Sequence, residues 1–258
     1  MSLVARALVV VLACFATVTN GRLIVELPDG SGAVEGLDLR DGETGSFEVS
    51  AFLGIPFAQP PTKTRRWTSP EKNLPWKGVR PAKHFAPNCM QLDPPAWGTM
   101  KKNVSEDCLY LNVWTPVQEK GEQQELTYPV MVFIHGGGYV SASATTSVFT
   151  GLLLLTLAFQ AYGGAYDTEL DGSSLCDLAD VVVVTIQYRV DIFGWLGSDH
   201  LRSRSEDNST GNWGAQDQRL ALKWVHSNIA AFHGAADVVT RCKTTAPVAL
   251  TACWMLTR

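Results

Sequence analysis

The fold is decided by the stretch VMVFIHGGG, which occupies residues 130–138. Its first five residues are all apolar, and a second run of this kind, VVVVTI, follows at residues 181–186. Strands that are covered by helices on both faces lack alternating polar residues and are typically rich in Val and Ile. The two runs therefore predict strands in the middle of an α/β sheet.

The segments around these strands predict shorter or less regular elements. Between residues 23 and 54, short apolar runs alternate with clusters of Gly, Asp and Ser, as in small hairpins. Residues 56–95 are rich in Pro, Trp and Lys, which predicts an irregular surface segment. Over residues 216–232 the apolar side chains recur at a helical spacing with one buried stripe, formed by Leu220, Leu222, Val225, Ile229 and Phe232.

The apolar segment at residues 148–161 has three interpretations. It contains four consecutive leucines at residues 152–155. A membrane-spanning helix needs about 20 apolar residues, and this segment is shorter, so a membrane role is not favoured. The sequence is compatible with a buried helix, with a hairpin that dips into a membrane, and with a stretch that does not belong to the folded protein.

Composition and charge exclude several classes of function. The 258 residues are 46% hydrophobic and 18% charged, which is typical of a globular protein rather than a disordered one. The net charge is -4 and the basic residues are scattered, so no positive surface gathers phosphates and nucleic acid is excluded as a partner. The sequence contains neither a metal-ligand cluster nor a phosphate-binding loop, and we therefore predict no cofactor and no metal.

The N-terminus predicts export. Residues 1–20 combine Arg6, an apolar run over residues 7–18 and small or polar residues after it, as a cleaved signal peptide does. We therefore expect a secreted protein or one in the lumen of the endoplasmic reticulum, where thiols pair. Two Asn-x-Ser/Thr sequons, at Asn103 and Asn208, are candidate glycosylation sites. An odd number of cysteines follows the signal peptide, so at least one is unpaired or pairs between chains: Cys89, Cys108, Cys176, Cys242 and Cys253.

The glycines at residues 136–138 suggest acyl-transfer chemistry. They directly follow the first buried strand, and glycines leave backbone N–H groups uncovered. In esterases and lipases the loop after such a strand forms an oxyanion hole, which holds the negative oxygen produced when an ester carbonyl is attacked. Gly137 and Gly138 are the candidate donors, whereas His135 before them is more often structural than catalytic at such a place.

Longer motifs carry a resemblance to a known family. The eleven residues EDCLYLNVWTP at 106–116 match at every position a signature of the type-B carboxylesterases, the group that includes liver carboxylesterases and cholinesterases. Further matches to that family are residues 52–58 with Pro60 and Pro61, and residues 171–175, 187–189, 193–196, 211–218, 221–225 and 228–229. The sequence therefore resembles this family over about residues 23–234.

This resemblance implies a fold and several residue roles. The expected fold is the N-terminal part of an α/β-hydrolase, with a mostly parallel central sheet, flanking helices and small N-terminal hairpins, in a domain at residues 22–234. The resemblance implies a disulfide between Cys89 and Cys108 and a structural ion pair between Arg66 and Glu106. It also implies that a complete form acts on a carboxylic ester.

The resemblance fails in the divergent tail, residues 235–258. In the family, a strand here leads to the turn Gly-x-Ser-x-Gly, which presents the nucleophilic Ser. When this chain is compared with that pattern without gaps, Thr245 occupies the position of the Ser. Lys243 and Pro247 replace the flanking glycines, and Gly-x-Ser-x-Gly does not occur in the 258 residues. By the family's topology, the strand at residues 130–134 pairs with the strand before the Ser. If the tail forms no such strand, an apolar sheet edge is left open.

Smaller departures from the family pattern occur elsewhere in the chain. Asp191 and His233 each stand where the family has Gly, and an apolar insertion lies between Ala144 and Tyr166.

The sequence is compatible with three candidate functions. The first is a secreted carboxylesterase-family chain that is truncated before the nucleophile and catalytically incompetent alone, because the triad acid and the catalytic His follow the Ser in the family. Truncation, mis-splicing or a frameshift would each produce such a chain. The second is a non-catalytic member that acts as a binding or adhesion protein, and the third is a fragment attached to a membrane through residues 148–161. Substrate preference and oligomeric state stay open.

Overall fold

The computed structural model describes residues 17–19, 22–40, 47–91, 103–118, 126–136, 138–139, 172–206, 208–245 and 250–256. For residues 17–19, 242–245 and 250–256 it describes the backbone alone. Gly137, the apolar segment at 148–161 and the predicted signal peptide, except for Thr17–Thr19, lie outside the described residues.

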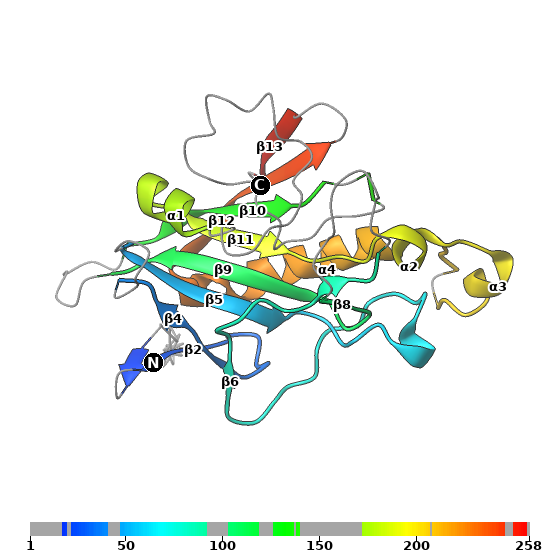
Figure 1. Ribbon diagram of the computed structural model, residues 1–258, viewed down its shortest axis with the longest axis horizontal. Coiled ribbons are helices and arrows are strands. Elements are labelled where there is room, and N and C mark those ends of the chain that lie inside the picture. Colours follow the sequence, from blue (N-terminus) through cyan, green and yellow to red (C-terminus); the bar gives the residue numbers. More distant parts are fainter. Residues whose placement is uncertain are drawn as a thin grey trace, which may run out of the picture.

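The described chain forms two principal sheets with helices packed around the larger one (Figure 1). The strands are β1 (Thr17–Thr19), β2 (Arg22–Glu26), β3 (Ala33–Glu35), β4 (Leu37–Asp38), β5 (Val49–Pro56), β6 (Val79–Pro81), β7 (Asn88–Cys89), β8 (Val104–Ser105), β9 (Tyr110–Pro116), β10 (Tyr128–Ile134), β11 (Val182–Ile186), β12 (Gly234–Thr245) and β13 (Leu250–Leu256). The helices are α1 (Ser173–Ala179), α2 (Asp191–Trp195), α3 (Asp199–Arg202) and α4 (Trp213–Asn228), with 3-10 helices η1 (Lys63–Arg65) and η2 (Ile229–Phe232).

The larger sheet has its parallel strands in the middle. Its order is β13-β12-β10-β11-β9-β5-β4. Strand β10 is parallel to both β11 and β12, with Val132 in register with Val184 and Arg241. The two apolar runs are therefore adjacent central strands of an α/β sheet, as their composition predicts. The expected parallel arrangement is limited to these three strands, because β9 is antiparallel to both β11 and β5, β4 is antiparallel to β5, and β13 is antiparallel to β12.

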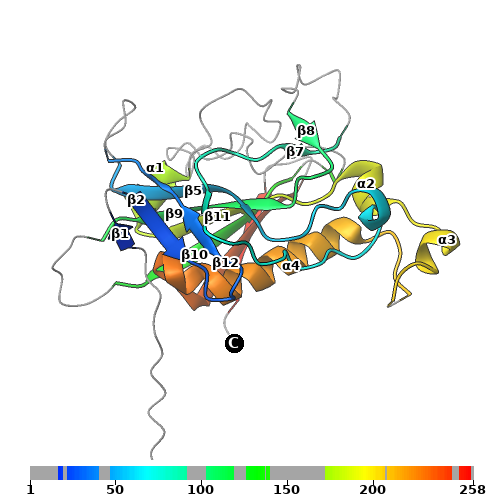
Figure 2. The ribbon, with the colours of Figure 1, turned by 90° about the horizontal axis from the view of Figure 1, so that it is seen from below.

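Helices cover both faces of this sheet. Figure 2 shows α4 crossing one face, while α1 lies against the other. The face under α4 buries the larger hydrophobic cluster, which includes Val132, Val184 and Trp224. The face under α1 buries a smaller cluster that includes Trp114 and Cys176. Burial on both faces is the reason why the central strands are continuously apolar.

Helix α4 begins at Trp213, earlier than the predicted residue 216, and continues as η2 to Phe232. The first turn of the helix contains Gly214. Glycine is a poor helix former, so the sequence did not predict a helix at this point. The glycine is needed because a Cβ at Gly214 would lie 2.3 Å from the carbonyl oxygen of Arg189. The close approach of helix and strand end therefore overrides local propensity. The buried residues of α4 are Trp213, Gly214, Asp217, Ala221, Trp224, Val225 and Asn228.

The N-terminal hairpins are present as predicted. Strands β2 and β3 are antiparallel, and Leu27 N donates to Gly32 O across their turn at 2.9 Å. Strands β4 and β5 form a second antiparallel pair. The smaller sheet has the order β1-β2-β3-β6, and its residues Val25 and Val34 join the larger core cluster. In the described part of residues 56–95 the chain is irregular apart from η1, β6 and β7.

The tail extends the sheet. Strand β12 pairs in parallel with β10, and Val239 of β12 is buried in the larger core cluster. Strand β13 pairs antiparallel with β12 and forms one edge of the sheet (Figure 1). The apolar edge that a disordered tail would leave on β10 is therefore covered. Among the helices that the structure describes, none has both the length and the apolar character to cross a bilayer.

Candidate active site

The carboxyl ends of β10, β11 and β12 lie at one edge of the sheet. Because these strands run parallel, the residues at their ends share this edge: His135 after β10, Gln187 after β11 and Thr245 at the end of β12. In open α/β sheets, ligands bind outside the carboxyl ends of the parallel strands. This edge is therefore the candidate active site.

His135 has a structural environment at this edge. It is 2% exposed, its ring stacks on Tyr188 with centroids 4.1 Å apart, and the Tyr188 hydroxyl donates to its carbonyl oxygen at 2.7 Å. Its Nδ1 lies 3.0 Å from the carbonyl oxygen of Gly136, while Nε2 is buried without a hydrogen-bond partner among the described residues. Burial lowers the pKa of His135 to about 4. The imidazole is therefore neutral at neutral pH and fixes the start of the glycine loop.

The glycine loop follows directly. Gly138 is exposed and has a φ of 60°, which favours glycine, and a Cβ there would meet nothing within 4 Å. Gly137, the other candidate donor, lies outside the described residues. After the loop, the carbonyl oxygen of Tyr139 accepts from Asp191 N at 2.7 Å, and its ring lies 4.5 Å from that of Trp195. Helix α2 therefore supports the end of the loop.

Thr245, which the sequence comparison predicts to stand at the position of the family's nucleophile, is the last residue of β12. It pairs with Leu250 of β13 in an antiparallel register. Strand β12 thus leads into a hairpin, whereas the nucleophile turn of α/β-hydrolases joins a strand to a helix.

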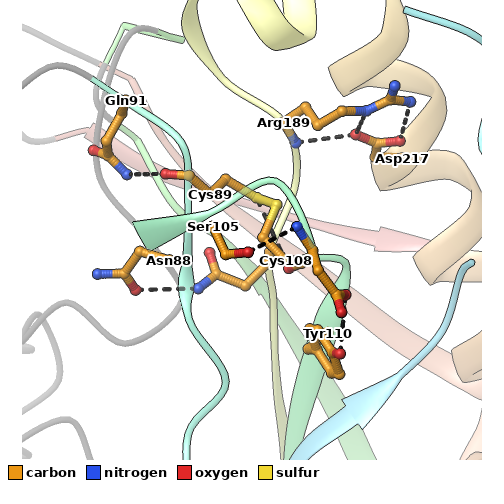
Figure 3. Close-up of a disulfide and its surroundings, with 10 residues drawn as sticks. Asn88, Cys89, Gln91, Ser105, Cys108, Tyr110, Arg189 and Asp217 are labelled. Atoms are coloured by element: carbon orange, nitrogen blue, oxygen red, sulfur yellow. Dashed lines mark hydrogen bonds and ion pairs between the residues drawn. A yellow bond between two sulfur atoms is a disulfide. The ribbon is translucent and has the colours of Figure 1, made fainter. Parts of the chain in front are cut away.

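Two connections fix the segment before β9. A disulfide joins Cys89 to Cys108, with Cα atoms 4.9 Å apart (Figure 3). Arg66 and Glu106 form a bidentate ion pair, in which Nε–Oε2 and Nη2–Oε1 are both 2.5 Å. The hydrogen bond to Glu106 raises the pKa of Arg66. The structure thus brings together both residue pairs that the resemblance implied, and both anchor the chain that leads into the sheet.

A fully buried ion pair, absent from the sequence predictions, holds α4 against the chain after β11. The Arg189 side chain is 3% exposed and that of Asp217 is 0% exposed. Asp217 Oδ2 accepts from Arg189 N at 3.0 Å and from Nε at 2.8 Å, and Oδ1 accepts from Nη2 at 2.7 Å (Figure 3). Arg189 Nη2 also donates to Thr68 O at 3.0 Å. The only signal in the sequence was that both residues lie in family-matched stretches, 187–189 and 211–218.

The sequence and the fold both have known relatives. The sequence profile of the carboxylesterase family matches residues 22–246. The chain belongs to the carboxylesterase family. It is 38% identical over 213 residues to acetylcholinesterase-1 of Trittame loki, which covers 81% of this chain and 33% of that protein. It is 40% identical over 202 residues to the medium-chain fatty acyl-CoA hydrolase precursor of Anas platyrhynchos, which covers 74% of this chain and 30% of that protein.

The fold agrees with that assignment. The solved structure of a Geobacillus stearothermophilus carboxylesterase matches this carboxylesterase-family chain with a TM-score of 0.62 at 33% identity, over 86% of this chain and 38% of that one. The α/β-hydrolase fold that the resemblance implied is thus confirmed. The chain spans about a third of the length of the curated relatives it matches.

Two residues that replace glycines of the carboxylesterase pattern have left-handed backbone. The φ angles are 53° at Asp191 and 61° at His233. Glycine adopts this conformation readily, whereas a side chain at the same φ costs about 1–2 kcal/mol, less for small polar residues. This carboxylesterase-family chain therefore carries backbone strain at both positions, which lie at the start of α2 and just after η2.

The two sequons are on the surface of this carboxylesterase-family chain. Asn103 and Asn208 are both exposed. A glycan on either would project into water, as glycosylation requires. Within the part of the chain that the structure describes, no group of three or more His, Cys, Asp or Glu side chains could hold a metal ion.

Proposed function

We propose that this chain forms the oxyanion-hole part of a carboxylic ester hydrolase of the secretory pathway. The observation that carries the proposal is the glycine loop at the carboxyl end of β10, in a chain of the carboxylesterase family. When a nucleophile attacks an ester carbonyl, the oxygen becomes negative, and backbone N–H groups of Gly137 and Gly138 would stabilise that charge. One such donor contributes about 3–4 kcal/mol to the transition state of well-studied hydrolases.

We further propose that these 258 residues alone do not hydrolyse esters. Thr245 stands at the position of the Ser, and its pairing with Leu250 supports an extended strand rather than a strained turn. A β-branched residue also disfavours the positive φ of such a turn. A hydroxyl that lacks a general base stays protonated and is a weak nucleophile. The divergence after Phe232 supports a product that is mis-spliced or frame-shifted before the nucleophile.

An assay of p-nitrophenyl acetate hydrolysis by the purified 258-residue chain tests whether the chain lacks esterase activity. A cooperative thermal unfolding transition first establishes that the material is folded. We expect a rate equal to that of the heat-denatured chain and no covalent labelling by a fluorophosphonate. The triple variant Lys243→Gly, Thr245→Ser, Pro247→Gly is the matched control, and it should be equally inactive because the motif alone supplies no base. Turnover by the unmodified chain together with a labelled side chain would contradict the proposal.

The origin of the divergent tail is tested on the transcript. Sequencing the transcript across the Phe232 codon should show that residues 235–258 are encoded in the same reading frame as the residues before them. A transcript that continues there into Gly-x-Ser-x-Gly would instead assign a complete serine esterase to the gene.

Secretion is tested by expression in a eukaryotic cell line. We expect the chain in the medium, with a new N-terminus near residue 20 and a mass that falls on treatment with a peptide N-glycosidase. The variants Asn103→Gln and Asn208→Gln identify which sequon is used. Retention of Met1 in a chain that stays in the cytosolic fraction would contradict secretion.

A further inference from the structure

The hairpin of β12 and β13 places two cysteines opposite each other. The antiparallel register pairs Cys242 with Cys253, inside a ladder that runs from Val239 paired with Leu256 to Thr245 paired with Leu250. The two cysteines are separated by eleven positions in sequence, yet the ladder makes them direct cross-strand neighbours.

Direct cross-strand neighbours have the spacing that a disulfide needs. In an antiparallel ladder, opposite Cα atoms are about 5.5 Å apart in hydrogen-bonded pairs and about 4.5 Å in the others. Disulfides join Cα atoms about 4.4–6.8 Å apart, so either kind of pair fits. Opposite residues also share one face of the sheet, so both Cβ atoms start from the same side.

We propose that Cys242 and Cys253 form an intrachain disulfide that closes the β12–β13 hairpin. The reaction is thiol–disulfide exchange with a disulfide-carrying oxidant of the secretory pathway or with oxidised glutathione. Two cysteine thiols lose two protons and two electrons, the Sγ–Sγ bond forms, and the oxidant's disulfide is reduced to two thiols.

The redox environment is indicated by the other half of the molecule. Cys89 and Cys108 are joined by a disulfide, and such bonds persist in oxidising compartments. The remaining cysteine after residue 20, Cys176, is buried in the core cluster under α1. To pair with Cys253 instead, Cys176 would have to leave that core, whereas Cys242 already stands opposite Cys253.

The position in the sheet favours access by an oxidant. Val239 of β12 is buried in the larger core cluster, whereas the neighbouring Val238 lies on the other face of the strand. Val238 on that face is 40% exposed. The hairpin also forms an edge of the sheet, so a disulfide here would hold the outermost strand in register.

Peptide mapping of the full 258-residue chain tests the proposal. The secreted chain is equilibrated with oxidised and reduced glutathione, alkylated without reduction, and digested with trypsin. Cleavage after Arg241 and Lys243 gives the dipeptide Cys242–Lys243 and the peptide Thr244–Arg258. We expect these two peptides to be found covalently linked and to separate on reduction.

A register variant provides the matched control. In Ala252→Cys combined with Cys253→Ala, the number of cysteines is unchanged, but the new cysteine stands opposite Lys243 on the other face. The linked peptide should fall to background in this variant. Two results on the unmodified chain would overturn the proposal: alkylated Cys242 and Cys253 in the unreduced digest, or Cys253 linked to Cys176 or to a second chain.

Discussion

Replacing Asp217 with Asn would remove the carboxylate that neutralises Arg189 in the protein interior. The side chains are 3% and 0% exposed, and three hydrogen bonds join the two residues. An Asn side chain keeps the size but places an NH2 group against the guanidinium, so a buried charge and at least one donor lose their partner. Breaking one side of a buried ion pair costs about 3–5 kcal/mol, a large part of the roughly 5–15 kcal/mol that stabilises a typical domain.

Urea unfolding followed by tryptophan fluorescence measures this loss. Trp213 and Trp224 of α4 are buried, so their exposure on unfolding contributes to this signal. With a urea slope of about 2 kcal/mol per M, the predicted loss lowers the unfolding midpoint by roughly 1.5–2.5 M. An unchanged slope would show that the variant still unfolds from the same compact state.

Two controls decide whether burial is the cause. Asp199→Asn breaks an exposed pair with Arg202 at 3.6 Å, and it should cost about 0.5 kcal/mol or less. The double variant Arg189→Met, Asp217→Leu replaces both charges with apolar side chains, and it should recover part of the stability that Asp217→Asn loses. The recovery is incomplete because the Arg189 N–H and the Thr68 carbonyl lose their partners. The reasoning is refuted if Asp217→Asn moves the midpoint no further than Asp199→Asn does.

Two further predictions concern histidines. His233→Gly should raise the free energy of unfolding by about 1 kcal/mol, because glycine adopts the φ of 61° without strain. As a control, Arg219→Gly at an exposed position within α4 should lower the free energy of unfolding by about 1 kcal/mol. Urea midpoints of the two variants that shift in the same direction would contradict this prediction. The His135 pKa of about 4 lies below its ordinary value of 6.5, so the unfolded chain binds more protons and stability falls, by up to about 3 kcal/mol, as the pH drops from 6.5 to 4. His135→Phe should remove that part of the pH dependence and the exposed His200→Phe should not, as urea midpoints across this pH range will show.

The centre of the sheet was predictable because burial on both faces leaves a local signal. The runs that became β10 and β11 contain no polar residue except Thr185, and residues of that kind fit a strand between two helical layers. The N-terminal hairpins were predictable for a similar reason, since Gly and Asp clusters mark the turns.

The contacts that hold these elements together were less predictable. Arg189 and Asp217 are 28 positions apart in sequence, and neither position carries a local sign that the side chain is buried and paired. The strand character of the tail was also missed. Much of what makes β12 a strand is its ladder with β10, in which Val239 stands beside Val130, and a pairing partner cannot be read from a single segment.

The strand that follows β12 runs antiparallel to it, which differs from the arrangement around the nucleophile of an α/β-hydrolase. Strand β12 ends at Thr245 and β13 begins at Leu250, so four residues join them. A parallel partner needs a crossover of about a dozen residues or more, usually a helix, so this connection permits only an antiparallel partner. In α/β-hydrolases the nucleophile sits where the strand turns into such a helix. Strand β12 therefore lies beside β10, as the family's topology requires, but its next partner in the sheet is the antiparallel strand β13.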